Sequence, residues 1–380
     1  MKYASFRHDG KKVSRFGLGC MRFPTRKTAD GKEKIDEDEA IRMVRHAIDC
    51  GVNYIDTAFL YAGSERVVGK ALLDGYREKV ILATKLPVGM AKTEADLESF
   101  YRKELERLQT DHIDVYFLHN LGIKNWENAV RLNAFDFMKR LKDEGKISYI
   151  AVSVHGTLEH WKKVLDTYPW DLCMMQHNYY DRFHQMGEEG LRYAAARGIP
   201  VVIMESLHGG MLAQGVPDAV RKAFGDWRPE LSDAERSLMW LINKPEPAVM
   251  LSGVSTMEQL EENLRVFDTY GVGCLTEEEN ALYDRAREAW KTVVKVPCTG
   301  CRYCMPCPQG VDIPDIFEVY NNLARVSDPE RAQKWLYPQV IADAGRGADK
   351  CVKCGKCERQ CPQEIKIIEE LQNAHAALMD

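Results

Sequence analysis

The chain has 380 residues, of which 45% are apolar and 29% are charged, and its formal net charge at pH 7 is −5. A chain of this length exceeds what one hydrophobic core usually supports, so we expect one large domain and one smaller domain. The net negative charge argues against a general nucleic-acid binder. The first twenty residues lack an export signal and no apolar run could span a membrane, so we expect a cytoplasmic protein without membrane association.

Residues 1–272 alternate short β-rich runs with longer helical patterns, which is typical of βαβ units around a parallel sheet. Residues 1–15, with Asp9-Gly10 in the middle, indicate a β-hairpin at the floor of this domain. Eight runs are predicted to be strands: Phe16–Cys20, Asn53–Asp56, Val80–Thr84, Ile113–Leu118, Ile150–Ser153, Leu172–Gln176, Val201–Met204 and Ala248–Ser252. Eight such units predict an α/β fold, a (β/α)8 TIM barrel.

Two predicted helices show signals at their first residues. Asp36 with Glu39 indicates a capping box before the helix that follows the first strand. Thr276 with Glu279 indicates a second one, which begins a helix running to about Lys295. We expect residues 273–297 to link the barrel to the C-terminal region.

Polar side chains follow three successive strands of the predicted barrel. Asp56 and Tyr61 follow the second strand, Lys85 ends the third, and His119 ends the fourth. Barrel enzymes carry their chemistry at these carboxyl ends. Tyr61 could give a proton to a carbonyl that becomes an alkoxide, if Lys85, held by Asp56, lowers its pKa from about 10. His119 could orient the carbonyl oxygen or assist the proton transfer.

Each of these four residues also has a purely structural interpretation. The aspartate could cap a turn, the tyrosine could be a loop aromatic, the lysine could be solvated, and the histidine could be a core residue. Their joint placement at successive strand ends favours the catalytic interpretation.

The loops after the seventh and eighth strands are candidates for a phosphate site. Gly209 and Gly210 offer backbone N–H groups, and the segment from Gly253 to Asn263 opens a helix whose N-terminus favours an anion. Ordinary turns and helix caps are the alternative explanation for these residues.

Eight of the twelve cysteines form two runs near the C-terminus. They are Cys298, Cys301, Cys304 and Cys307, followed by a proline, and Cys351, Cys354, Cys357 and Cys361, also followed by a proline. The second run matches the ferredoxin pattern C-x2-C-x2-C-x3-C-P, whereas the first has one residue fewer before its last cysteine. This pattern predicts two [4Fe–4S] clusters.

In that ferredoxin pattern, the fourth cysteine of each run binds the other cluster. We therefore assign Cys298, Cys301, Cys304 and Cys361 to one cluster. Cys307, Cys351, Cys354 and Cys357 are assigned to the other. Zinc and a disulfide framework are the alternatives, but the thiolates are too closely spaced for the usual paired zinc ligands, and the chain is long for a disulfide scaffold. The four scattered cysteines, Cys20, Cys50, Cys173 and Cys274, are expected to be small buried hydrophobic residues.

The strand-end residues resemble those of the aldo-keto reductases, together with the segment Ser64–Leu72, over roughly residues 1–270. With the cysteine runs, the whole chain resembles the iron–sulfur branch of that family. The resemblance implies a catalytic tetrad of Asp56, Tyr61, Lys85 and His119. It also implies NAD(P)H contacts from Ser153, Gln176, Gly209, Gly210, Gly253, Ser255, Thr256, Gln259, Glu262 and Asn263.

Some positions differ from the family pattern. Val154 follows Ser153 where an asparagine is usual, and Glu205 replaces the tyrosine that stacks on nicotinamide. Gly253 and Gln259 stand where Lys and Arg often bind the 2′-phosphate. A preference for NADP is therefore not implied.

The sequence predicts an oxidoreductase that reduces a carbonyl or related small molecule, with a barrel over residues 1–272 and a ferredoxin-like domain over residues 298–380. One alternative is a reductase fed by ferredoxin, another redox protein or FMN, because a [4Fe–4S] cluster passes one electron at a time whereas nicotinamide moves two. The other alternative is an electron carrier or redox sensor on a non-catalytic barrel.

Overall fold

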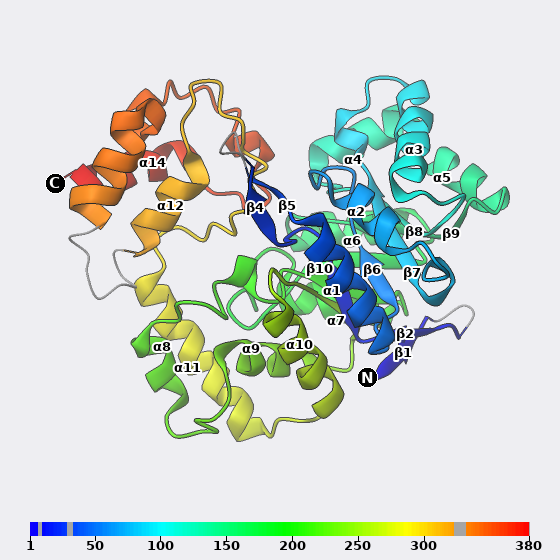
Figure 1. Cartoon of the computed structure of the whole chain (residues 1–380), viewed down its shortest axis with the longest axis horizontal. Coiled ribbons are helices and arrows are strands. Elements are labelled where there is room, and N and C mark those ends of the chain that lie inside the picture. Colours follow the sequence, from blue (N-terminus) through cyan, green and yellow to red (C-terminus); the bar gives the residue numbers. More distant parts are fainter. Residues whose placement is uncertain (7–9, 29–32, 323–331, 380) are drawn as a thin grey trace. The chain divides into compact units, whose positions relative to one another are not determined.

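The computed structural model describes residues 1–6, 10–28, 33–322 and 332–379. Eight parallel strands close a barrel in the order β10-β11-β12-β3-β6-β7-β8-β9 (Figure 1). They are β3 (Phe16–Gly19), β6 (Tyr54–Asp56), β7 (Ile81–Leu86), β8 (Ile113–Leu118), β9 (Ile147–Ser153), β10 (Leu172–Gln176), β11 (Val201–Met204) and β12 (Pro247–Gly253). The eight predicted strands and the (β/α)8 fold are confirmed.

Helices follow the strands, as expected for a parallel sheet that needs crossover connections. Up to the last barrel strand they are α1 (Glu37–Asp49), α2 (Ser64–Ala71), α3 (Glu94–Leu108), α4 (Ile123–Arg131), α5 (Ala134–Asp143), α6 (Leu158–Thr167), α7 (Gly187–Ala196), α8 (Asp218–Phe224) and α9 (Asp233–Ile242). Beyond it come α10 (Met257–Thr269), α11 (Glu277–Val293), α12 (Ile313–Asn322), the π-helix η4 (Ala332–Arg346) and α14 (Ile367–Met379).

The floor of the barrel is covered by the predicted hairpin. Strand β1 (Tyr3–Ser5) pairs antiparallel with β2 (Lys12–Ser14). Phe6 belongs to the same buried cluster as side chains from the barrel strands, and its ring meets that of Tyr149 edge-on at 5.2 Å between centroids. Asp9, expected in the turn, lies outside the described residues.

A second hairpin was not predicted. Strand β4 (Thr25–Lys27) pairs antiparallel with β5 (Glu33–Ile35), and every residue of β4 is exposed. Because these strands have no buried face, the chain shows no alternation of apolar and polar residues here.

The two predicted capping boxes have different outcomes. Thr276 and Glu279 form theirs at the start of α11, as expected. The prediction at Asp36 is wrong, because its side chain makes no capping hydrogen bond and Glu39 instead accepts hydrogen bonds from Arg42 at 2.7 and 2.8 Å. Thr93 forms a capping box with Asp96 at the start of α3.

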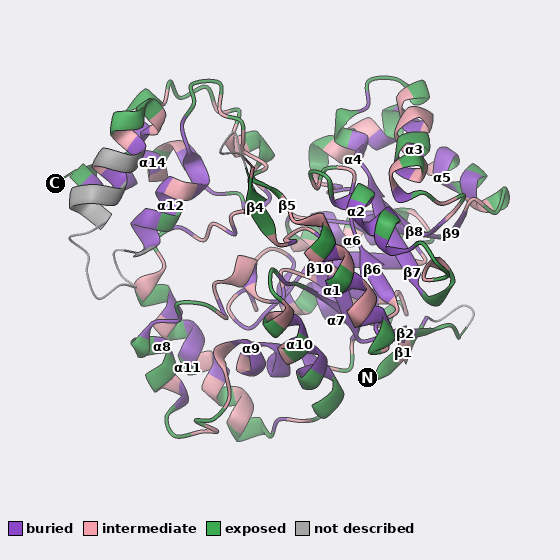
Figure 2. Ribbon diagram, in the orientation of Figure 1, coloured by how far each residue is buried: buried purple, intermediate pink, exposed green. Residues whose placement is uncertain are grey.

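The chain divides into two compact units, one of Met1–Ser206 with Leu238–Leu275 and the other of Leu207–Ser237 with Thr276–Asp380. In the first unit the buried residues follow the barrel strands (Figure 2). The second unit contains its own buried cluster, which includes Ile316, Phe317, Tyr337 and Leu371, with six of the eight paired-run cysteines packed against it. The boundaries expected at residues 272 and 297 stay a prediction.

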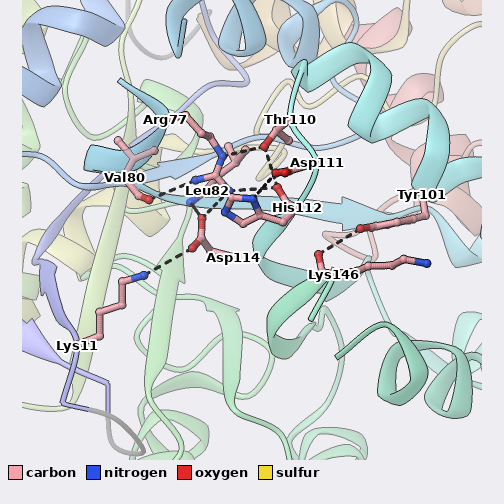
Figure 3. Close-up of polar contacts among 10 residues, drawn as sticks. All are labelled: Lys11, Arg77, Val80, Leu82, Tyr101, Thr110, Asp111, His112, Asp114 and Lys146. Carbon is pink, nitrogen blue, oxygen red and sulfur yellow. Dashed lines mark hydrogen bonds and ion pairs between the residues drawn. The ribbon is translucent and has the colours of Figure 1, made fainter. Parts of the chain in front are cut away.

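The amino ends of β7 and β8 are joined by a buried carboxylate (Figure 3). Asp114 is 5% exposed. Its carboxylate accepts a hydrogen bond from the backbone N–H of Leu82 and lies 2.9 Å from Nη2 of Arg77. Lys11, from the hairpin side of the barrel, lies 3.5 Å from its other oxygen. Polar groups at this end of such a barrel serve stability, since catalysis occupies the opposite end.

Candidate active site

Three neighbouring strands bring the predicted catalytic residues together at the carboxyl end of the barrel. Lys85 Nζ donates to Asp56 Oδ1 at 2.5 Å and to the carbonyl oxygen of Thr57 at 2.8 Å. The same ammonium lies 4.9 Å from the centroid of the Tyr61 ring. The rings of Tyr61 and His119 meet edge-on, with 6.2 Å between centroids. This cluster presents a phenol, a cation and an imidazole to one small volume.

Burial governs the charges of this cluster. Asp56, Lys85 and His119 are at most 6% exposed. Burial raises the pKa of Asp56, and the adjacent Lys85 opposes that shift. Burial, with Lys85 and His155 adding to it, lowers the pKa of His119 well below its usual value of 6.5. At neutral pH His119 is therefore a neutral imidazole, which can donate a hydrogen bond to an oxygen without carrying a charge.

Hydrogen bonds anchor both ends of the loop that carries Tyr61. The hydroxyl of Ser64, the first residue of α2, donates to the carbonyl oxygen of Cys20 at 2.7 Å and lies 2.8 Å from the hydroxyl of Thr57. The N–H of Ser64 donates to the carbonyl oxygen of Tyr61. The chain that leaves β6 is thus fixed against the loop that follows β3.

A partly buried ion pair with α3 adds a second anchor to this loop. Arg107 Nη1 lies 3.0 Å from Glu65 Oε2 and 3.4 Å from the carbonyl oxygen of Phe59, and its guanidinium stacks 4.0 Å from the centroid of the Phe59 ring. The hydroxyl of Thr84 donates to Glu65 Oε1 at 2.8 Å. Burial raises the pKa of Glu65, while Thr84, Arg107 and Lys85 oppose the shift. We call Glu65, Thr84, Arg107 and Phe59 the loop anchor.

Sequence reasoning missed the loop anchor. Glu65 belongs to the segment that resembles the aldo-keto reductases, but nothing in the linear pattern marks it as buried or pairs it with Arg107, 42 residues away. A glutamate and an arginine on predicted amphipathic helices are ordinarily expected to be exposed to solvent.

Two expected nicotinamide contacts lie at the ends of β9 and β10, and both are buried. The hydroxyl of Ser153 accepts from the backbone N–H of Asn120 at 2.8 Å, next to His119. The amide of Gln176 donates to Asp181 Oδ2 at 2.7 Å. Glu205, in place of the usual tyrosine, has a positive φ of 57°.

The expected dinucleotide contacts after β12 surround the start of α10. Thr256 caps this helix by accepting from the N–H of Gln259, and the side chain of Gln259 accepts from the N–H of Ser255 at 2.8 Å. Asn263 is buried and donates to the hydroxyl of Ser252 at 2.9 Å. Glu262, also on α10, is partly exposed. Most of these side chains therefore already have hydrogen-bond partners within the protein.

The stem of Arg22, from another loop, lies next to Gly253. A Cβ on Gly253 would lie 3.6 Å from Cβ of Arg22, and the hydroxyl of Ser255 donates to the carbonyl oxygen of Arg22 at 2.8 Å. A side chain at position 253 would therefore be in ordinary van der Waals contact with the stem of an arginine from the loop that follows β3.

Gly209 and Gly210 belong to the second compact unit. Gly209 has a φ of 64°, and a Cβ there would lie 2.3 Å from the carbonyl oxygen of Thr299, in the first cysteine run. Close packing against that run is therefore a sufficient reason for glycine at this position. Gly210 has a φ of 98° and open space around it.

The eight paired-run cysteines line two pockets of the second unit. Cys298, Cys301, Cys304 and Cys361 line one pocket. Cys307, Cys351, Cys354 and Cys357 line the other pocket, together with Cys304. Both pockets are otherwise walled mostly by apolar side chains such as Ile313, which suits a cluster that must be shielded from water.

A single metal ion would require a defined spacing of its donor atoms. Four thiolates around one zinc ion would stand roughly 3.8 Å apart, given Zn–S bonds of about 2.3 Å. Among the described residues, no group of three or more His, Cys, Asp or Glu side chains is arranged to hold a single metal ion.

Two of the four scattered cysteines are buried as expected. Cys20 and Cys173 are buried and Cys274 is half-buried. Cys50 is exposed, so its expected burial is wrong. It follows the last residue of α1, where the helix ends at the surface, and its sulfur lies 3.6 Å from His46 Nε2.

Comparison with known proteins agrees with this geometry. The model of the Aldo/keto reductase family matches residues 15–288, and that of a 4Fe-4S dicluster domain matches residues 297–367. Fold, site and matches together define an oxidoreductase on a (β/α)8 barrel with an iron–sulfur domain. The chain belongs to the aldo/keto reductase family and carries a C-terminal 4Fe-4S dicluster domain.

Individual relatives cover the barrel. An uncharacterized oxidoreductase, YqkF, of Bacillus subtilis is 30% identical over 70% of this chain and 90% of its own length. L-galactose dehydrogenase of Arabidopsis thaliana is 26% identical over 60% of this chain and 78% of its own.

Solved structures agree with the fold. The holo form of aldo-keto reductase AKR11C1 from Bacillus halodurans is similar with a TM-score of 0.62 and 27% identity, over 75% of this chain and 96% of that one. An aldo/keto reductase from Klebsiella pneumoniae, solved with NADP and acetate, has a TM-score of 0.58 and 26% identity, over 75% and 95%. Within the described part of this chain, no helix is long and apolar enough to cross a membrane.

Proposed function

We propose that this protein reduces a carbonyl or related small molecule, with Tyr61 as the general acid. The observation that carries the proposal is the buried Lys85–Asp56 pair, which holds an ammonium 4.9 Å from the centroid of the Tyr61 ring. Removing two charges from water is costly, and a barrel without catalytic use would gain little from keeping them there. This argues against a non-catalytic carrier or sensor.

The residues of the site divide the work. Tyr61 gives its proton to the developing alkoxide, and Lys85 stabilises the resulting phenolate by its charge. His119, neutral at physiological pH, donates a hydrogen bond to the same oxygen and fixes the orientation of the carbonyl. A bound nicotinamide would supply the hydride, and Ser153 and Gln176 are the residues proposed to hold its amide.

Replacing Tyr61 tests this proposal. Tyr61→Phe should lower turnover of an aldehyde such as 4-nitrobenzaldehyde about 10²-fold or more, because the positioned proton donor is lost. Tyr193→Phe, which removes a surface hydroxyl that bonds Asp166, is the matched control and should change little. Circular dichroism and iron content should match the parent protein in both variants. Full turnover by Tyr61→Phe would contradict the role of Tyr61 as the general acid and would favour the carrier or sensor alternative.

For the nicotinamide cofactor, we propose that NADH binds at least as well as NADPH. Gly253 has no side chain to reach a 2′-phosphate, and Gln259 is engaged by the N–H of Ser255. Gly253 is exposed, and a side chain there would make only ordinary contacts. Gly253→Lys should therefore improve the affinity for NADPH about tenfold relative to NADH, measured by binding heat. A strong NADPH preference in the parent protein would contradict the proposal.

The clusters have a separate expected content and ligation. We propose two [4Fe–4S] clusters, with Cys298, Cys301, Cys304 and Cys361 holding one and Cys307, Cys351, Cys354 and Cys357 holding the other. The two pockets described above support this grouping. Keeping eight thiolates reduced also supports a cytoplasmic location.

Electrons could also reach the barrel without nicotinamide. The dicluster domain favours a one-electron donor such as ferredoxin as the second candidate supply. The aldo/keto reductase from Klebsiella pneumoniae was solved with NADP, which supports nicotinamide as the first candidate supply. Titrating anaerobic protein with NADH, NADPH, FMN and reduced ferredoxin, while following absorbance and binding heat, separates these supplies.

A further inference from the structure

The loop of the second cysteine run is exposed and positively charged. Cys354 and Val352 are exposed, the latter by 61%. A lysine directly precedes each of the first three cysteines of the run, and these lysines, with one arginine, are all exposed: Lys350, Lys353, Lys356 and Arg359. We call these four residues the cationic rim.

Few anions neutralise the cationic rim. Asp349 pairs with Lys350 at 2.7 Å. Glu358 is half-buried and accepts the backbone N–H of Ile368 at 2.9 Å. Within the ranges that the structure describes, Lys353, Lys356 and Arg359 form no ion pair. Arg359 instead reaches the carbonyl oxygen of Cys354 at 3.4 Å, which keeps its charge beside the cysteine loop.

The first cysteine run differs in charge. Between Cys298 and Cys307 the one charged residue is Arg302. Arg302 lies 3.0 Å from Asp315 and 3.7 Å from Asp312, so two carboxylates offset its charge. The two runs bind the same kind of group in our proposed function, yet only the second presents uncompensated cations.

We propose that the cationic rim is the docking surface for an acidic one-electron carrier protein, which would give up one electron per encounter close to Cys354. The inference rests on the proposed cluster function. The net charge of the chain is −5, so an acidic partner is repelled by the molecule as a whole and is attracted at this loop. Such local complementarity steers encounter and selects the partner's orientation. An exposed ligand loop also shortens the path that an electron must cross.

Charge reversal tests the docking surface. In anaerobic holoprotein, Lys353→Glu/Lys356→Glu should raise the Kd for an acidic bacterial ferredoxin at least tenfold at 20 mM NaCl, and it should flatten the dependence on salt up to 300 mM. Lys353→Gln/Lys356→Gln should have an intermediate effect and serves if the reversed variant does not fold. Lys222→Glu/Lys291→Glu, in the same compact unit with the same change in net charge, should alter Kd about twofold at most.

Further measurements separate docking from the cluster chemistry. Methyl viologen, a small cationic reductant, should reduce all variants at the parent rate, since it needs no acidic docking face. Three outcomes would each overturn the proposal. They are an equal loss of ferredoxin affinity in the Lys222→Glu/Lys291→Glu control, comparable binding of a short DNA duplex, and a shifted midpoint potential with unchanged Kd. Parent protein without iron would overturn the proposed function and this inference together, whereas intact iron with an unaffected ferredoxin Kd would overturn the inference alone.

Discussion

His177 follows β10 and is fully buried, with its ring 5.0 Å from that of Trp240. Neither ring nitrogen has a hydrogen-bond partner among the described residues. Burial, with Lys244 adding to it, lowers the pKa of His177 to about 3. The folded protein therefore holds this imidazole neutral through a pH range in which the unfolded chain takes up a proton.

This residue makes part of the stability depend on pH. Below the unfolded pKa of about 6.5 only the unfolded state gains the proton, so stability falls by about 1.4 kcal/mol per pH unit. His177→Phe should remove that loss, gaining about 1.4 kcal/mol on the parent protein between pH 7.5 and pH 5.5. Urea unfolding followed by tryptophan fluorescence measures it, with the half-buried His46→Gln as the control. An unchanged pH dependence in His177→Phe would show that this histidine is not the cause.

At the scale of elements, α3 holds the loop between β6 and α2 through the loop anchor. Arg107→Met would leave the carboxylate of Glu65, 3% exposed, without its cation. We expect a loss of about 2 kcal/mol in the free energy of unfolding, because an unpaired buried charge is costly. Carbonyl turnover should also fall about tenfold, since Phe59 and Tyr61 share one short loop.

Two further variants test the explanation given for Arg107→Met. Arg102→Met, on the same helix and 75% exposed, should cost at most about 0.5 kcal/mol although it removes an ion pair with Glu98. Glu65→Gln combined with Arg107→Met should recover part of the stability, because the buried charge is gone. A double variant no better than Arg107→Met alone would refute the electrostatic explanation.

At the other end of the barrel, the carboxylate of Asp114 joins β7 and β8 to Arg77 (Figure 3). Asp114→Asn should cost about 2 kcal/mol in unfolding free energy, since its charge-assisted bonds are lost. Turnover should stay within about twofold, because the proposed catalytic side chains lie at the carboxyl ends. Asp111→Asn, 95% exposed in the parent, is the control and should change neither quantity. A large loss of turnover in folded Asp114→Asn would contradict the division between the two ends.

For the whole molecule, the crossed ligation that we propose would tie distant parts of the second unit together. Cys307→Ser should disturb the cluster proposed for Cys351, Cys354 and Cys357, and Cys361→Ser should disturb the other one. Each variant should lower the iron content from about eight toward about four per chain and alter a different one of two spectroscopic signals. Cys50→Ser is the control. If each variant instead altered the cluster of its own run, the crossed assignment would be wrong.

The sequence alone determined the features that depend on residues close together in the chain. Strand and helix periodicity predicted the eight strands, and cysteine spacing predicted the dicluster domain. The Lys85–Asp56 pair was also foreseeable, because parallel strands in a barrel bring their carboxyl ends to one face. The start of the helix after Thr276 could be predicted because both residues of its capping box lie within one turn.

Other features were decided only by tertiary structure. The pairing of Glu65 with Arg107 and the packing of Gly209 on Thr299 each join segments whose distance in the chain says nothing of their distance in space. Local signals also failed where a nearby group competed: Glu39 bonds Arg42 rather than capping α1. Burial of a charged or polar group depends on what the rest of the chain places around it, and that sum over distant contacts exists only in the folded molecule.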